Sequence, residues 1–210
     1  MRAVVLTAAL VLAASLAAGA QERPTFTFHG AGAVVWVRSD TAGGAVRLRG
    51  PALAGEGRVG LHGVTLGVGF LEGRLRPVGA ATPRDLIEGR VLIAARPLPW
   101  LEMSAGPVVR AYVTTAATER WVFWQARARV DAPIVTTTLT SYLELWRALS
   151  SQVNQATPVG RVQGGEAGVL YRPPRGSVWM RLGYRVDDAA LGAGGETLEA
   201  ISLAVGVGRP

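Results

Sequence analysis

Hydrophobic and polar side chains alternate along most of the chain beyond residue 20. The clearest run covers 119–131, where Val122 and Trp124 share one parity and Arg127 and Arg129 share the other. A helix would distribute these positions around its axis, whereas successive side chains of a β-strand point to opposite faces. The run therefore predicts a strand with one apolar face and one charged face.

Similar alternation recurs along the chain, in the runs 62–74, 86–96, 100–113 and 177–187. These runs have about 11–13 residues, whereas strands of soluble sheets usually have five or six. Tilted transmembrane strands need about 9–11 residues plus flanks. Length and alternation together predict an all-β protein, an antiparallel up-and-down transmembrane β-barrel of about ten strands (eight to ten).

The predicted connections support this topology because short and long ones alternate. Short turn signals lie at 54–57, 97–99, 131–133 and 173–176. Longer polar or glycine-rich connections lie near 39–44, 75–85, 150–160 and 188–195, with a shorter one of this set at 114–118. Membrane barrels have short turns on one side and longer loops on the other. An even number of strands would place both termini on the side of the short turns.

One segment, 139–153, fits two kinds of element. Its residues Leu139, Tyr142, Leu143 and Trp146 follow the spacing of an amphipathic helix face. The preceding β-branched stretch at 133–140 favours a strand instead. We expect a strand, and a helix here would make the strand count odd.

The two strand faces define the candidate site residues. The residues predicted to line the lumen are Glu88, Arg90, Arg96, Glu102, Arg110, Gln125, Arg127, Arg129, Asp131, Glu144, Glu166, Arg181, Arg185 and Asp187, together with Arg47 and Arg49 from the weakest predicted strand, 45–53. The residues predicted to face lipid are Val64, Leu66, Val68, Val91, Ile93, Trp124, Met180, Leu182, Leu203 and Val205. Arg–carboxylate pairs would satisfy a buried polar interior, whereas an excess of Arg would favour small anionic solutes.

Tryptophan side chains divide between the two faces. Trp36 and Trp124 share the parity of the apolar sets, and the polar parity includes Trp100, Trp121, Trp146 and Trp179. Bulky rings on the polar face would help to fill a narrow barrel and would stack on Arg side chains. The sequence therefore predicts a largely filled, Arg-rich lumen.

The first 20 residues and the composition predict that the protein is exported. Arg2, the apolar run 3–17 and the small residues at 18–20 predict a secretory signal peptide over 1–20, followed by a single β-barrel domain over 21–210. All 22 basic residues are Arg, the net charge is +7, and the chain has no Cys. The positive charge is spread over the strands rather than gathered in one patch, which argues against a nucleic-acid partner.

On these features the chain resembles small bacterial outer-membrane β-barrel proteins. The resemblance covers most of the chain after residue 20 and rests on pattern, without a sharp motif. It implies export to the outer membrane of a Gram-negative cell, contact with outer-membrane lipid, and insertion by the barrel-assembly machinery. Our main interpretation is a monomer with a structural or narrow-channel role, and the Arg-rich lumen makes small anionic solutes its candidate substrates for transport.

Two other hypotheses use the same residues. A soluble periplasmic, lipocalin-like barrel would turn the apolar face inward around an apolar ligand, and periodicity alone does not distinguish inside from outside. A lipid-modifying enzyme would require His29 or His62 to meet a Ser and a carboxylate. With no zinc-type His/Cys spacing and no Lys for a phosphate-binding loop, we expect no enzymatic activity, no metal and no cofactor.

Overall fold

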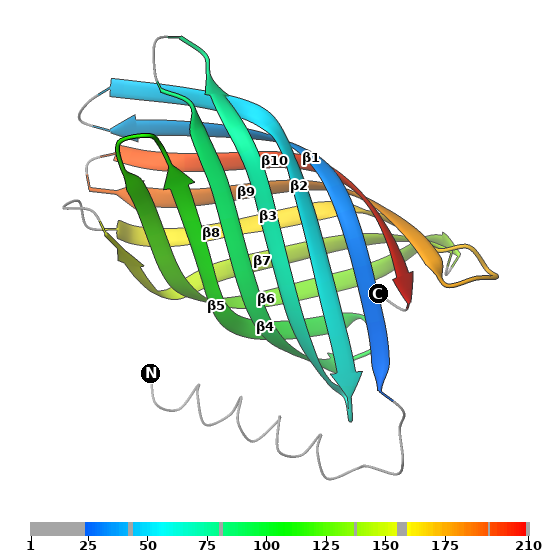
Figure 1. The fold of residues 1–210 in the computed structure, drawn as a ribbon. Helices are drawn as coiled ribbons and strands as arrows, with labels where there is room; N and C mark the ends of the chain where they lie inside the picture. The colour runs from blue at the N-terminus through cyan, green and yellow to red at the C-terminus, as the bar shows by residue number, and fades with distance from the viewer. Residues whose placement is uncertain are drawn as a thin grey trace.

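The chain folds into a closed barrel of ten antiparallel strands, which confirms the predicted fold class (Figure 1). The computed structural model describes residues 24–41, 44–79, 82–136, 138–154, 159–192 and 194–208. The predicted signal peptide, 1–20, lies outside the described residues. The strands are β1 (Thr25–Thr41), β2 (Gly44–Leu61), β3 (Val64–Pro77), β4 (Arg84–Leu98), β5 (Leu101–Val113), β6 (Thr118–Thr136), β7 (Leu139–Val153), β8 (Val159–Tyr171), β9 (Val178–Leu191) and β10 (Gly194–Gly208).

Each strand pairs with its neighbours in sequence, and the pairing of β1 with β10 closes the cylinder. Thr27 lies opposite Gly208 at one end of this seam. We call this end, where β1 begins and β10 ends, the terminal end, and the opposite end the distal end. The segment 139–153 is strand β7, so the strand alternative is correct.

Three predicted connections are wrong, and one of them is the turn expected at 131–133, which lies inside β6. The turn expected at 54–57 lies inside β2, and the chain reverses instead at His62 and Gly63. Both residues have positive φ, 52° and 75°, as a type I′ hairpin turn requires. The loop expected at 188–195 is also shorter than predicted, because β9 extends to Leu191 and β10 starts at Gly194.

Strand β2 keeps a regular alternation but exchanges its hydrophobic face halfway along. Near its distal start, Leu48 points inward while Arg47 and Arg49 are exposed on the outside. Toward the terminal end, Glu56 is buried inside and Leu53 is exposed outside. A strand's side-chain geometry does not change along its length, so the exchange comes from the sequence itself.

Neighbouring strands make the same exchange. In β3 the outward residue is Phe70 toward the terminal end and Arg74 toward the distal end, where Leu75 is buried inside. In β10 the outward residue is Leu203 toward the terminal end and Glu199 toward the distal end. In these strands the outer face is therefore apolar near the terminal end and polar near the distal end.

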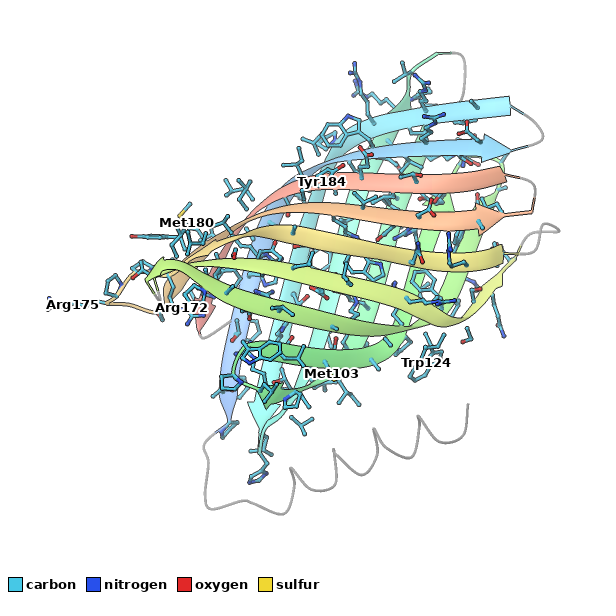
Figure 2. The ribbon with its side chains drawn as sticks, turned by 180° about the vertical axis from the view of Figure 1, so that it is seen from behind. Met103, Trp124, Arg172, Arg175, Met180 and Tyr184 are labelled. Carbon is cyan, nitrogen blue, oxygen red and sulfur yellow. The ribbon has the colours of Figure 1, made fainter. Side chains whose placement is uncertain are left out.

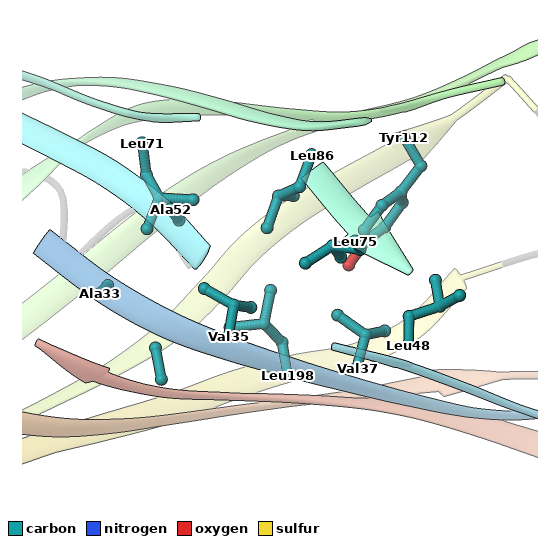
Figure 3. Close-up of a cluster of buried hydrophobic side chains, with 11 residues drawn as sticks. Ala33, Val35, Val37, Leu48, Ala52, Leu71, Leu75, Leu86, Tyr112 and Leu198 are labelled. Atoms are coloured by element: carbon teal, nitrogen blue, oxygen red, sulfur yellow. The ribbon is translucent and has the colours of Figure 1, made fainter. Parts of the chain in front are cut away.

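An apolar cluster fills the distal interior across β1–β5 and β10 (Figure 3). The side chains that pack together include Val35, Val37, Leu48, Leu75 and Leu198. A second apolar cluster, centred on rings from β6, packs against β8 and β9. Among the residues that the structure describes, no helix is long and apolar enough to cross a membrane.

Candidate functional site: the charged barrel interior

Four charged side chains form the centre of the barrel interior. The carboxylate of Glu88 accepts hydrogen bonds from Arg110 at 2.7 and 2.9 Å and from Arg185 at 2.8 and 3.0 Å. Asp187 accepts from Arg185 at 2.6 Å and also pairs with Arg110. All four side chains are buried, and Glu88 is only 3% exposed. Each charge is thus compensated by two opposite charges, which a low-dielectric interior requires.

A second network continues toward the terminal end from β2, β4 and β5. Glu56 is buried between Arg58 and Arg90 and forms an ion pair with each. Arg58 also donates to Glu102 at 2.9 Å, and Arg96 reaches the same carboxylate at 3.2 Å. The two carboxylates therefore link three arginines from two strands.

The opposite wall, β6 and β7, carries a third set of pairs. Arg127 donates to Glu144 at 2.7 Å and to the side-chain oxygen of Gln125. Arg129 donates to Asp131 at 2.8 Å. Gln125, Arg127, Arg129 and Asp131 belong to the alternating run 119–131, and all four lie on the inward face of β6.

Aromatic rings fill the space between the charges. The guanidinium of Arg127 lies 4.6 Å from the ring centre of Trp146, and that of Arg129 lies 4.3 Å from the ring centre of Tyr142. Glycine provides the room on β8, because a Cβ at Gly164 would lie 2.7 Å from the Trp146 ring. Rings over guanidinium planes exclude water and strengthen the ion pairs beside them.

The interior narrows from the terminal end inward. A cavity of about 300 Å³ opens there, lined by residues that include Thr27, Arg58, His62 and Arg96. Farther inside, a cavity beside His29 and Arg185 has a volume of about 50 Å³, and one beside Glu144 about 10 Å³. The side chains thus leave little space in the middle of the barrel.

The structure brings the predicted lumen residues together inside one barrel. Nearly all take part in the pairs described above, whereas Arg181 lies against the His29 ring nitrogen at 3.4 Å and over the Tyr142 ring. Arg47 and Arg49 do not belong to this set, because both are exposed on the outside. Their prediction is wrong because it applied the polarity of the terminal half to the distal half of β2.

The predicted lipid-facing residues lie on the outer surface, most of them toward the terminal end, whereas Trp124 lies in the distal half of β6. Figure 2 shows Met103, Trp124, Met180 and Tyr184 projecting from the outside of the wall. The same surface carries Leu66, Val68, Val91, Ile93, Leu182, Leu203 and Val205, all exposed, and half-buried Val64 at the start of β3. Trp100, predicted on the polar face, is instead half-exposed in the turn between β4 and β5.

Sequence reasoning missed two buried acids. Glu56 lies in the false turn at 54–57, and Glu196 directly follows the false loop at 188–195. Glu196 lies among the distal apolar side chains and accepts a hydrogen bond from Tyr112 at 2.6 Å. With these acids inside and Arg47 and Arg49 outside, the interior is closer to charge balance than the sequence suggested.

Among the described residues, neither histidine forms a hydrogen bond with a serine or a carboxylate. The ring of His29 packs edge-on against Trp179, 5.2 Å between centroids, and its ring nitrogen lies 3.4 Å from the Arg181 guanidinium. His62 is a turn residue with positive φ. Among the described residues, no group of three or more His, Asp or Glu side chains could hold a metal ion.

Comparison with protein-family models and with curated protein sequences finds no match. Solved structures do match. Neisserial surface protein A is 14% identical, with 90% of this chain and 100% of that chain covered and a TM-score of 0.39. The translocator domain of the autotransporter NalP from Neisseria meningitidis is 12% identical, with coverages of 94% and 92% and a TM-score of 0.47.

An outer-membrane channel from Pseudomonas putida F1 is 11% identical, with 90% of this chain and 97% of that chain covered and a TM-score of 0.47. All three are outer-membrane β-barrel proteins, and each likeness concerns the fold alone. At the level of the fold, the predicted resemblance to outer-membrane β-barrels is confirmed by the closed barrel of ten strands.

Proposed function

We propose that this protein is an outer-membrane β-barrel with a structural role and a closed lumen. The observation that carries the proposal is the exchange of faces along β1–β3 and β10. Near the terminal end the outside is apolar and the inside charged, which suits a wall surrounded by lipid. Near the distal end the outside is polar and the inside apolar, which suits a wall surrounded by water.

In this proposal the exchange of faces implies one orientation of the barrel in the membrane. The terminal half lies in the bilayer with both ends of the barrel domain on the periplasmic side, and the distal half projects from the cell surface. A soluble barrel with an apolar ligand inside is disfavoured, because the terminal half of the interior holds buried ion pairs instead of an apolar cavity. Exposed Leu66, Val68 and Phe70 would also face water in that case.

Fractionation of cells that express the full chain tests the location. We expect recovery in the outer membrane, with a folded band that shifts on boiling before gel electrophoresis. Recovery in the soluble periplasmic fraction without detergent would refute the proposal and favour the soluble barrel.

Closure of the lumen is supported by the buried quartet Glu88, Arg110, Arg185 and Asp187 and by the distal apolar cluster, which lie one after the other along the barrel. We expect the purified barrel to give no steady conductance in planar lipid bilayers. A narrow channel is the second candidate function, favoured by the 300 Å³ cavity that opens at the terminal end. Steady anion-selective conductance would support it over the closed barrel.

A further inference from the structure

Three arginines lie side by side on the outer face of β2 and β3 near the distal end. Arg49 is directly opposite Arg76 on the neighbouring strand, and Arg47 is the next outward residue along β2. We call Arg47, Arg49 and Arg76 the arginine triad. All three side chains are exposed. Like charges directly opposite each other on a sheet repel and destabilise the pair.

The acids on this face are engaged elsewhere or lie away from the triad. Glu199 on β10 is directly opposite Trp36, so strand β1 separates it from Arg49. Asp40 pairs with Arg38 at 3.0 Å, and Asp85 lies 3.8 Å from Arg74. Glu72 is four residues from Arg76 along β3, about 13 Å for an extended strand. Within the described part of the chain, no carboxylate forms an ion pair with a triad arginine. The triad is therefore a concentrated positive charge that an external anion can neutralise.

The triad also lies at the boundary where the outer face changes character. Trp36 is directly opposite Arg49 on β1, and its ring is partly exposed on the outside. Farther toward the terminal end, Val34 and Leu53 continue the outward apolar surface, with Leu53 69% exposed. Tryptophan at such a boundary is typical of the membrane–water interface. A ligand that fits this surface would have apolar chains toward the terminal end and anionic groups toward the distal end.

We propose that the arginine triad binds the phosphate groups of a phosphorylated glycolipid in the outer leaflet, with the acyl chains of the lipid against Trp36, Val34 and Leu53. Guanidinium groups suit this ligand because they bind phosphate oxygens through paired, charge-assisted hydrogen bonds. Binding also removes the repulsion between Arg49 and Arg76. The inference rests on the proposed outer-membrane location and adds a lipid-binding surface to it.

Titration of the full barrel, folded in neutral detergent micelles, tests this inference. The probes are diphosphorylated lipid A and the same lipid without its phosphates. We expect the wild-type barrel to bind the phosphorylated lipid more tightly. The combined variant Arg47→Gln, Arg49→Gln and Arg76→Gln should weaken that binding by about a hundred-fold, because each arginine near a lipid surface contributes roughly a factor of five.

A matched control removes the same charge elsewhere. The variant Arg120→Gln, Arg147→Gln and Arg161→Gln changes three exposed arginines on β6, β7 and β8 and should bind as the wild type does. Equal loss in both variants, or equal wild-type affinity for lipid with and without phosphates, would overturn the inference. Displacement of the lipid by inorganic phosphate at equal concentration would also overturn it, because the site would then hold free phosphate.

A second variant and the fractionation experiment keep the inference testable. If the triple variant does not fold, Arg49→Gln alone replaces it, and the comparison of the two lipids needs no variant. Recovery of the barrel in the soluble fraction would refute the proposed location. A barrel that is recovered in the outer membrane but shows no preference for phosphorylated lipid would refute only the lipid site.

Discussion

At the scale of single residues, the barrel interior depends on pairing between side chains that are far apart in sequence. Arg185 donates to Glu88 across 97 positions, and Arg110 pairs with Asp187 across 77. Burying four charges is tolerable only while each has its partners, since an isolated charge in this environment would cost several kcal/mol. The quartet therefore stabilises the folded barrel mainly by avoiding unpaired charges.

Removing one acid of the quartet should be severe. We expect Glu88→Ala to lower the free energy of unfolding by about 3–5 kcal/mol, because Arg110 and Arg185 would remain buried and lose a partner. The measurement is urea unfolding of the barrel in lipid vesicles. Asp85→Ala on the same strand is the control, since its contact with Arg74 is exposed, and its effect should stay within about 0.5 kcal/mol. Similar effects of the two variants would contradict the role of the quartet.

On the outer face, the cost of a charge should depend on its position along the strand. Leu203 lies in the apolar part of β10 beside Leu182, whereas Thr197 lies on the same face near the distal end. We expect Leu203→Arg to destabilise the barrel by about 2–4 kcal/mol and Thr197→Arg by at most about 1 kcal/mol. Unfolding in vesicles measures both. Equal costs would mean that lipid does not surround Leu203.

At the scale of the strands, alternation was sufficient to predict the fold but not the position of every side chain. It identified a barrel of about ten strands because a period of two is specific to β-structure. It failed in β2, where the apolar residues move from the even positions Val46 and Leu48 to the odd positions Leu53 and Val59. This change of parity resembles a break between strands, which explains the false turn at 54–57. Residue parity fixes two faces, but only their surroundings decide which one is inside.

The exchange of faces in β2 gives a direct labelling test. The chain has no Cys, so Arg47→Cys and Leu53→Cys each introduce a single thiol on the same outer face. In intact cells a membrane-impermeant maleimide should label position 47 quickly and position 53 hardly at all, because lipid covers the latter. After unfolding in urea both should react. Equal labelling of the two positions in cells would contradict a membrane boundary between them.

At the scale of the whole molecule, the proposed surroundings explain why the two halves of the barrel differ in polarity, because lipid would surround one half and water the other. On β1–β3 and β10 the terminal half has the polarity of a membrane barrel and the distal half has the polarity of a soluble barrel with an apolar core, whereas the distal outer face of β4, β6 and β7 remains apolar at Ile87, Trp124 and Leu149. Distal elongation of the strands replaces the long loops expected from the sequence. The arginine triad lies where these two halves meet on β2 and β3, which in the proposed outer-membrane location is the level of the headgroups.

Closure within one chain can be tested at the seam between β1 and β10. Arg38 and Thr197 are directly opposite each other there, and such partners have Cα atoms about 4.5–5.5 Å apart, a distance that a disulfide can span. We expect the variant Arg38→Cys with Thr197→Cys to form a disulfide within a monomer under mild oxidation.

The control pairs Arg38→Cys with Asp188→Cys. Asp188 is opposite Thr197 on the next strand, β9, so its distance from Arg38 is about two strand spacings, beyond the reach of a disulfide. Non-reducing gel electrophoresis distinguishes the products, since an internal crosslink changes the mobility of the unfolded monomer. A dimer band from the first variant would show that β1 pairs with β10 of a second molecule, which would contradict a barrel closed by one chain.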